Sequence, residues 1–191
     1  MALMLACGGP FASARAADLE AGRHQAAAAC ASCHGPHGHS TTPRVPSLAG
    51  QPAVYIHWQL ILFRDNRRRS PEMSPFAASL TDAEIANLAA YYAAQAPQPP
   101  PAAPRDPDKI AAGERAFERH HCVSCHAAGV TGERYAPRLA GLHYEYLLRQ
   151  LQAFKAGTRG ELDGTMTMAA QPLSEEEIDS LAHYIANRLH P

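Results

Sequence analysis

The pentapeptide Cys30-Ala-Ser-Cys33-His34 occurs again as Cys122-Val-Ser-Cys125-His126, 92 residues further along this chain of 191 residues. Outward from it, Pro46-Ser-Leu48-Ala49-Gly50 recurs as Pro137-Arg-Leu139-Ala140-Gly141, displaced by 91 residues. Self-similarity at a fixed displacement indicates a repeated structural unit. The sequence therefore predicts two copies of one module, each of roughly 80 residues.

A proline-rich stretch separates the two copies. Six prolines lie between residues 97 and 107, and a proline inside a helix removes an amide donor and clashes with the preceding turn. The stretch is therefore expected to be an extended, semi-rigid connector. We divide the chain into a signal peptide (1–16), a first domain (17–95), a Pro-rich linker (96–106) and a second domain (107–191).

Both modules have helical periodicity and no convincing alternating strand pattern, so the predicted fold class is all-α. Helices are expected at residues 53–64, 107–121 and 143–155. A further helix in each copy begins at a capping box, Thr81-x-x-Glu84 and Ser174-x-x-Glu177. The apolar stripes that follow are Ile85, Leu88, Ala89 and Tyr92, and then Ile178, Leu181, Ala182 and Ile185. Since modules of this size form marginal cores, a large apolar prosthetic group would supply what the side chains lack.

Cys-x-x-Cys-His is the attachment signature of c-type haem. Its two thiols reach one edge of the porphyrin, and the histidine then directs its imidazole at the iron. We therefore predict two haem c groups, held covalently by Cys30, Cys33, Cys122 and Cys125, with His34 and His126 as iron ligands. A zinc site formed by both cysteine pairs, a disulfide and a thioredoxin-like pair are weaker alternatives, because they leave the histidines or the repeat unexplained.

The sixth iron ligand is expected to be a methionine in a loop before the last helix of each module. Met73 precedes Leu80 by seven residues, and Met166 precedes Leu173 by seven. Met168 aligns instead with Pro75 and remains the alternative in the second module. Isolated methionines usually fill cores, but the equivalent placement in both copies favours ligation. Two histidines, His57 and His143, compete weakly because neither is repeated.

On these motifs the chain resembles class I cytochromes c, and the tandem arrangement resembles the dihaem cytochrome c₄ family. The resemblance implies two tandem class I cytochrome c domains in a periplasmic carrier, with the two haems facing each other across the domain interface. It also implies that the backbone carbonyls of Pro46 and Pro137 bind the two haem-ligating histidines. Gly22 and Gly113 match the small residue that lets the first and last helices cross. The first module departs by having Ala26 where the second has Phe117, which puts that helix contact in doubt.

Arginines at 64, 67, 68 and 69 form the one conspicuous charge cluster. Most of them are expected in a solvated turn, with one or two near a buried haem edge and able to pair with propionates. The second module has only Lys155 and Arg159 in this region, so the cluster is not simply repeated. Over the whole chain, 17 Lys and Arg balance 18 Asp and Glu, which argues against nucleic acid as a partner.

The first residues resemble an export signal. An apolar run from Leu3 to Ala12 precedes Ala14-Arg15-Ala16, a small-x-small cleavage pattern. Cys7 faintly resembles a lipidation site, but only six residues precede it. We expect a periplasmic protein without a transmembrane helix in the mature chain, since no other stretch has the ~18 apolar residues that one requires.

His/Met ligation fills both axial positions of each iron and favours outer-sphere electron transfer over catalysis. The predicted function is therefore an electron carrier and not an enzyme. Expected partners are a quinol-oxidising complex, a haem-copper oxidase or a dehydrogenase. The alternatives are a dedicated electron-transfer subunit of a dehydrogenase complex, and a dihaem enzyme such as a peroxidase or a thiosulfate-oxidising cytochrome.

Overall fold

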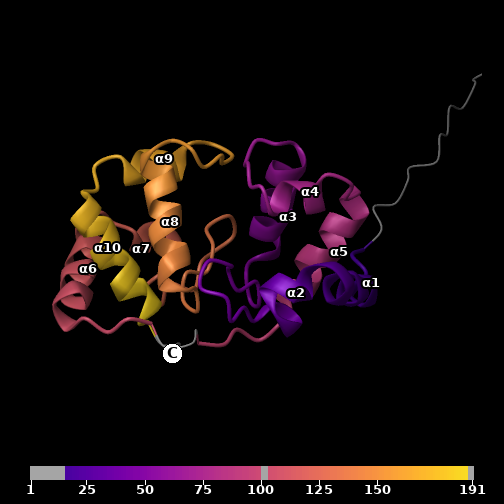
Figure 1. Ribbon diagram of the computed structural model, residues 1–191, viewed down its shortest axis with the longest axis horizontal. Helices are drawn as coiled ribbons and strands as arrows, with labels where there is room; N and C mark the ends of the chain where they lie inside the picture. The colour runs from indigo at the N-terminus through magenta and orange to yellow at the C-terminus, as the bar shows by residue number, and fades with distance from the viewer. Residues whose placement is uncertain (1–15, 100–102, 189–191) are drawn as a thin grey trace, which may run out of the picture.

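The computed structural model describes residues 16–99 and 103–188. The predicted signal peptide, apart from Ala16, and the predicted alternative lipid site Cys7 lie outside this range. Two groups of helices lie side by side, with residues 95–99 leading along the lower edge of the view from the first toward the second (Figure 1). Within the described ranges there is no strand, only an isolated bridge between Glu133 and Ala136. The all-α class predicted from the sequence is confirmed.

The helices of the two groups follow the same order along the chain. In the first group they are α1 (Leu19–Gln25), η1 (Ala26–Cys30), α2 (Ala31–His34), η2 (Pro36–Gly38), α3 (Ala53–Arg64), α4 (Met73–Ala77) and α5 (Asp82–Ala93). In the second they are α6 (Pro107–Arg119), α7 (Val123–His126), α8 (Tyr144–Lys155), α9 (Thr165–Ala170) and α10 (Glu175–Ala186). Only α6 ends before its predicted limit, since His121 has a φ of 53° and leaves the helical region.

Side-chain caps fix where the long helices begin. Both predicted capping boxes are present, Thr81 with Glu84 at α5 and Ser174 with Glu177 at α10. Each satisfies backbone N–H groups that have no partner inside the helix. The predicted apolar stripes are confirmed as well, because all eight residues are at most 3% exposed.

The first and last helices of each group cross at a glycine. A Cβ atom on Gly22 of α1 would lie 2.3 Å from the carbonyl oxygen of Asn87, and one on Gly113 of α6 would lie 2.0 Å from that of Ser180. Real Cβ atoms do not approach this closely. The close crossing implied by the family resemblance is therefore present in both copies.

The two crossings differ in the aromatic contact beside the glycine. In the second copy Phe117 packs against Tyr184 with ring centroids 5.5 Å apart. In the first copy Ala26 takes this place, and a cavity of about 150 Å³ lies beside it, lined among others by Tyr91 and Tyr92. The chain there continues as a π-helix, η1, before reaching the cysteine pair. The expected departure in the first module is thus a packing gap, while the helix contact itself is kept.

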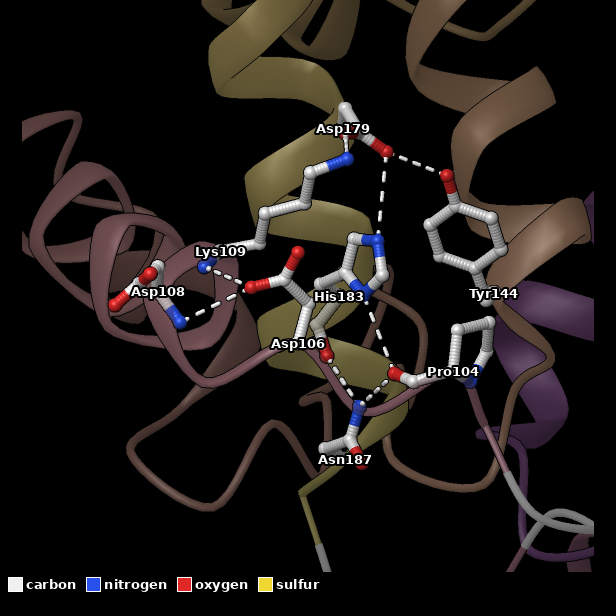
Figure 2. Close-up of polar contacts among 8 residues, drawn as sticks. All are labelled: Pro104, Asp106, Asp108, Lys109, Tyr144, Asp179, His183 and Asn187. Carbon is white, nitrogen blue, oxygen red and sulfur yellow. Dashed lines mark hydrogen bonds and ion pairs between the residues drawn. The ribbon is translucent and has the colours of Figure 1, made fainter.

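A polar cluster ties the end of the linker to the second group of helices (Figure 2). The carbonyl oxygen of Pro104 accepts hydrogen bonds from His183 Nδ1 at 3.2 Å and from Asn187 Nδ2 at 3.1 Å. On its other side His183 faces Asp179, which also accepts a hydrogen bond from the Tyr144 hydroxyl. These hydrogen bonds therefore hold the end of the linker in place against α10, just before α6 begins.

Candidate haem sites

The two cysteine pairs lie on matching short turns. Cys30 and Cys122 are half-buried and Cys33 and Cys125 are exposed, and none of the four is joined to another in a disulfide. Burial raises the pKa of Cys30 and of Cys122. No group of three or more potential metal-binding His, Cys, Asp or Glu side chains occurs in the described part of the chain. The cysteine pairs thus do not converge on a shared zinc site.

The histidine that follows each pair is buried and held by a proline carbonyl. His34 is 7% exposed and His126 is 5% exposed. His34 Nδ1 donates to the carbonyl oxygen of Pro46 at 2.9 Å, and His126 Nδ1 donates to that of Pro137 at 3.0 Å. This bond fixes the tautomer, so that Nε2 carries the lone pair that a metal needs. Burial lowers the pKa of both imidazoles, which keeps them neutral.

The repeated Pro-x-Leu-Ala-Gly segment shapes the loop that presents this carbonyl. The N–H groups of Leu48 and Ala49 both donate to the carbonyl oxygen of Gly38, at 2.8 and 3.3 Å. Leu139 and Ala140 donate in the same way to Val130, at 2.8 and 3.0 Å. The closing glycines have φ of 69° at Gly50 and 88° at Gly141, a region that favours glycine. The motif recurs because both loops need this backbone path.

A cavity of about 920 Å³ opens beside the first pair and collects the predicted first-domain residues. Its lining includes Cys30, Cys33, His34, Pro46 and Met73. The volume lies at the upper end of the range of about 300–1,000 Å³ found for ligand and cofactor sites. Thiols, an imidazole and a thioether are the donors that haem c requires. Size and donor chemistry both fit this group.

The predicted methionines of the second domain differ sharply in exposure. Met166 is half-buried and packs against the same hydrophobic core as Cys122 and Leu139. Met168, the alternative, is 68% exposed. This difference agrees with the register argument that prefers Met166.

Two arginines, Arg68 buried and Arg159 half-buried, occupy the interface between the domains. Arg68, which is 8% exposed, donates to the Tyr146 hydroxyl at 3.4 Å, and Arg159 donates to the Tyr55 hydroxyl at 3.1 Å. Each guanidinium also stacks on a phenylalanine of its own domain, at 4.6 Å from the Phe63 centroid and 4.3 Å from the Phe154 centroid. Arg68 therefore does have a counterpart, so the sequence-based view that the cluster is not repeated was wrong for this one position.

The arginine pair lacks an acidic partner among the described side chains. Neither forms an ion pair, and Arg159 Nε is buried without a hydrogen-bond acceptor. Burial and the positive charge of Arg68 lower the pKa of Arg159. Both arginines line the 920 Å³ cavity. Buried charges require an opposite charge nearby, and the propionates of haem would supply it.

Sequence reasoning missed a second set of contacts across the interface. The buried Gln51 side chain donates to the carbonyl oxygen of Arg138 at 2.7 Å and accepts from its N–H at 3.0 Å. His143, a weak ligand candidate, is instead hydrogen-bonded through Nε2 to the carbonyl oxygen of Ser40 at 2.9 Å. Neither Gln51 nor His143 is repeated, so the self-similarity of the chain gave no signal for them.

Comparison with known proteins identifies two related domains. The family model described as "Cytochrome c" matches residues 110–188, and the one described as "Cytochrome C oxidase, cbb3-type, subunit III" matches residues 17–91. Within the described ranges no helix combines the length and the apolar character needed to cross a bilayer.

Full-length relatives cover nearly the whole chain. Cytochrome c4 of Thiocapsa roseopersicina is 38% identical, over 91% of this chain and 94% of the relative. The "Thiosulfate dehydrogenase electron acceptor" of Stutzerimonas stutzeri (strain A1501) is 35% identical, over 97% of this chain and 91% of the relative. The crystal structure of reduced recombinant cytochrome c4 from Pseudomonas stutzeri superposes with a TM-score of 0.82 at 31% identity, covering 92% of this chain and all of that one.

Proposed function

Since this chain belongs to the dihaem cytochrome c4 family and carries two haem c groups, we propose that His34 and Met73 ligate the first iron, and His126 and Met166 the second. Cys30 with Cys33, and Cys122 with Cys125, form the thioether bonds. Haem c supplies a one-electron iron couple when bound. The observation that carries the proposal is the cavity that brings together the first cysteine pair, its histidine and Met73.

With these ligands, both axial positions of each iron would be filled by residues of this chain. The Pro46 and Pro137 carbonyls orient the two imidazoles, and neutral, buried histidines remain available as ligands. A filled coordination sphere leaves no position for a substrate. We therefore assign the chain the role of an electron carrier and not of an enzyme. The signal-like first residues and the covalent haem attachment support a periplasmic location. The repeat and the Pro-rich linker support two domains, at 17–95 and 107–191.

The proposed partners are a quinol-oxidising complex as donor and a haem-copper oxidase as acceptor. A second candidate is the direct acceptance of electrons from a thiosulfate dehydrogenase, which the name of the S. stutzeri relative favours. The two are separated by mixing the oxidised protein with each purified donor in a stopped-flow spectrometer. Rapid reduction by the dehydrogenase with thiosulfate, and none by the quinol-oxidising complex, would establish the second role.

The axial ligands are tested by the far-red charge-transfer band of Met-ligated ferric haem. Met73→Ala and Met166→Ala should each remove about half of this band. Met168→Ala, a matched control on the exposed side of α9, should leave it intact. Carbon monoxide should leave the reduced spectrum nearly unchanged at neutral pH. Rapid carbon monoxide binding by the unaltered protein would contradict the proposed ligation at one of the irons.

A further inference from the structure

A carboxylate holds the short helix that carries Met166. Glu161 accepts hydrogen bonds from the backbone N–H of Met166 (Oε2, 2.9 Å) and of Thr167 (Oε1, 2.7 Å). These N–H groups lie in the first turn of α9 and have no partner inside the helix. The N-cap residue of α9 is Gly164, which has no side chain to accept them. Glu161 therefore acts as the cap from three residues upstream.

The rotational setting of α9 decides which methionine faces the core. Residues two apart on a helix point about 200° from each other, since one turn takes 3.6 residues. Accordingly Met166 packs against the core while Met168 is 68% exposed. Glu161 accepts a hydrogen bond from the amide of Met166 itself. This contact therefore fixes the rotation of α9 at the residue that faces the core.

The described part of the first domain has no second candidate methionine and no carboxylate bound directly to the methionine amide. Met73 is its only described methionine, and no second one follows within α4. The Met73 N–H donates to the neutral Ser70 hydroxyl at 3.1 Å. This hydroxyl in turn donates to the Glu72 carboxylate at 2.8 Å, so the carboxylate reaches the Met73 amide only through Ser70. A bidentate carboxylate thus occurs in the domain that has two candidate methionines, and a single hydroxyl in the domain that has one.

We propose that Glu161 is a positioning residue that selects Met166 over Met168 as the axial ligand of the second haem. The inference rests on the proposed His126/Met166 ligation. It assigns Glu161 no contact with the iron or the porphyrin. Charge-assisted hydrogen bonds are about twice as strong as neutral ones, so loss of the carboxylate should let α9 shift and release Met166.

The test uses full-length holoprotein in a Met73→Ala background, where the far-red band reports the second domain alone. The concentration of imidazole that halves this band measures how firmly Met166 is held. In Glu161→Ala this concentration should fall about tenfold, which corresponds to about 1.4 kcal/mol. Glu161→Gln should fall in between, because an amide offers one acceptor oxygen instead of two.

Asp163→Ala is the matched control, since Asp163 Oδ1 accepts from the neighbouring Thr165 N–H at 3.1 Å. It removes a cap from the same turn without touching Met166, and should change the imidazole concentration less than twofold. In addition, Met168→Ala should weaken the band only when Glu161 is also replaced, because only then does Met168 compete. Equal effects of Glu161→Ala and Asp163→Ala, or none from Glu161→Ala, would overturn the role of Glu161. A protein that shows no far-red band before any change at Glu161 would instead refute the proposed ligation.

Discussion

The helix crossing at Gly113 offers a direct test of the packing, because two effects of known size oppose each other there. Replacing glycine by alanine within a helix normally stabilises it by about 1 kcal/mol. At Gly113, however, the new Cβ would lie 2.0 Å from the Ser180 carbonyl oxygen and 2.6 Å from the Tyr184 Cβ. Real contacts begin near 3.0 Å, so α6 and α10 must separate by about 1 Å.

This separation should outweigh the gain in helix propensity. Overpacking a well-packed site destabilises by about 1–3 kcal/mol, and here the atoms in the way include backbone, which cannot rotate aside. Taking the upper end and subtracting the propensity gain leaves a net loss of about 2 kcal/mol. For a domain of this size that corresponds to a melting temperature lower by about 10 °C.

The assay is thermal unfolding of the holoprotein, followed by far-ultraviolet circular dichroism and by the haem absorbance. Ala111→Gly is the matched control, since Ala111 lies on the exposed side of the same helix and reports propensity alone. It should lose about 1 kcal/mol. A Gly113→Ala protein that is as stable as the unaltered one, or more stable, would refute the close crossing.

Three further outcomes are expected. Gln51→Ala should lower the free energy of unfolding by about 2–4 kcal/mol, since it removes two buried hydrogen bonds across the domain interface. Calorimetry should then resolve two unfolding transitions, and a single transition at an unchanged temperature would contradict this. Ala26→Phe should raise the melting temperature of the first domain, because the adjacent cavity of about 150 Å³ is of a size that holds a benzene ring; a lower melting temperature would show that the gap does not admit the ring. Capping hydrogen bonds lower the pKa of Glu84 and Glu177, so their contribution is complete above the unfolded pKa of about 4.3 and is lost as the pH falls through the lower folded values. Acid titrations followed by circular dichroism should show this contribution disappear in the Glu84→Gln, Glu177→Gln double variant, and an unchanged acid limb would contradict it.

The sequence predicted those features that depend on local patterns or on the repeat. Capping boxes at Thr81 and Ser174 fix helix starts through neighbours three residues away, so a short window suffices to find them. The apolar stripes of α5 and α10 are likewise periodic along the chain and proved buried. The comparison of the two copies also led to the pairing of each Cys-x-x-Cys-His with a downstream methionine, which stays a proposal.

Contacts between the modules could not be predicted from the sequence, because they follow neither a local pattern nor the repeat. Gln51 meets the backbone of Arg138, and a backbone partner leaves no mark in the identity of the residue that supplies it. Arg68 looked like one member of a solvated run of arginines, and its neighbours Arg67 and Arg69 are indeed exposed. Only the fold shows that the chain turns Arg68 inward, toward the Tyr146 hydroxyl of the other domain.

The arginine pair links the two modules by reciprocal contacts. Arg68 leaves the first domain to reach Tyr146, and Arg159 leaves the second to reach Tyr55. Displacing either domain would therefore break both contacts. While the domains are docked, the positive charges of Arg68 and Arg159 lie close enough to repel each other, which is unfavourable unless anions are present. Haem propionates at this cavity would neutralise the pair. The interface and the cofactor bound in this cavity would then stabilise each other, because both would depend on the same buried positive charges.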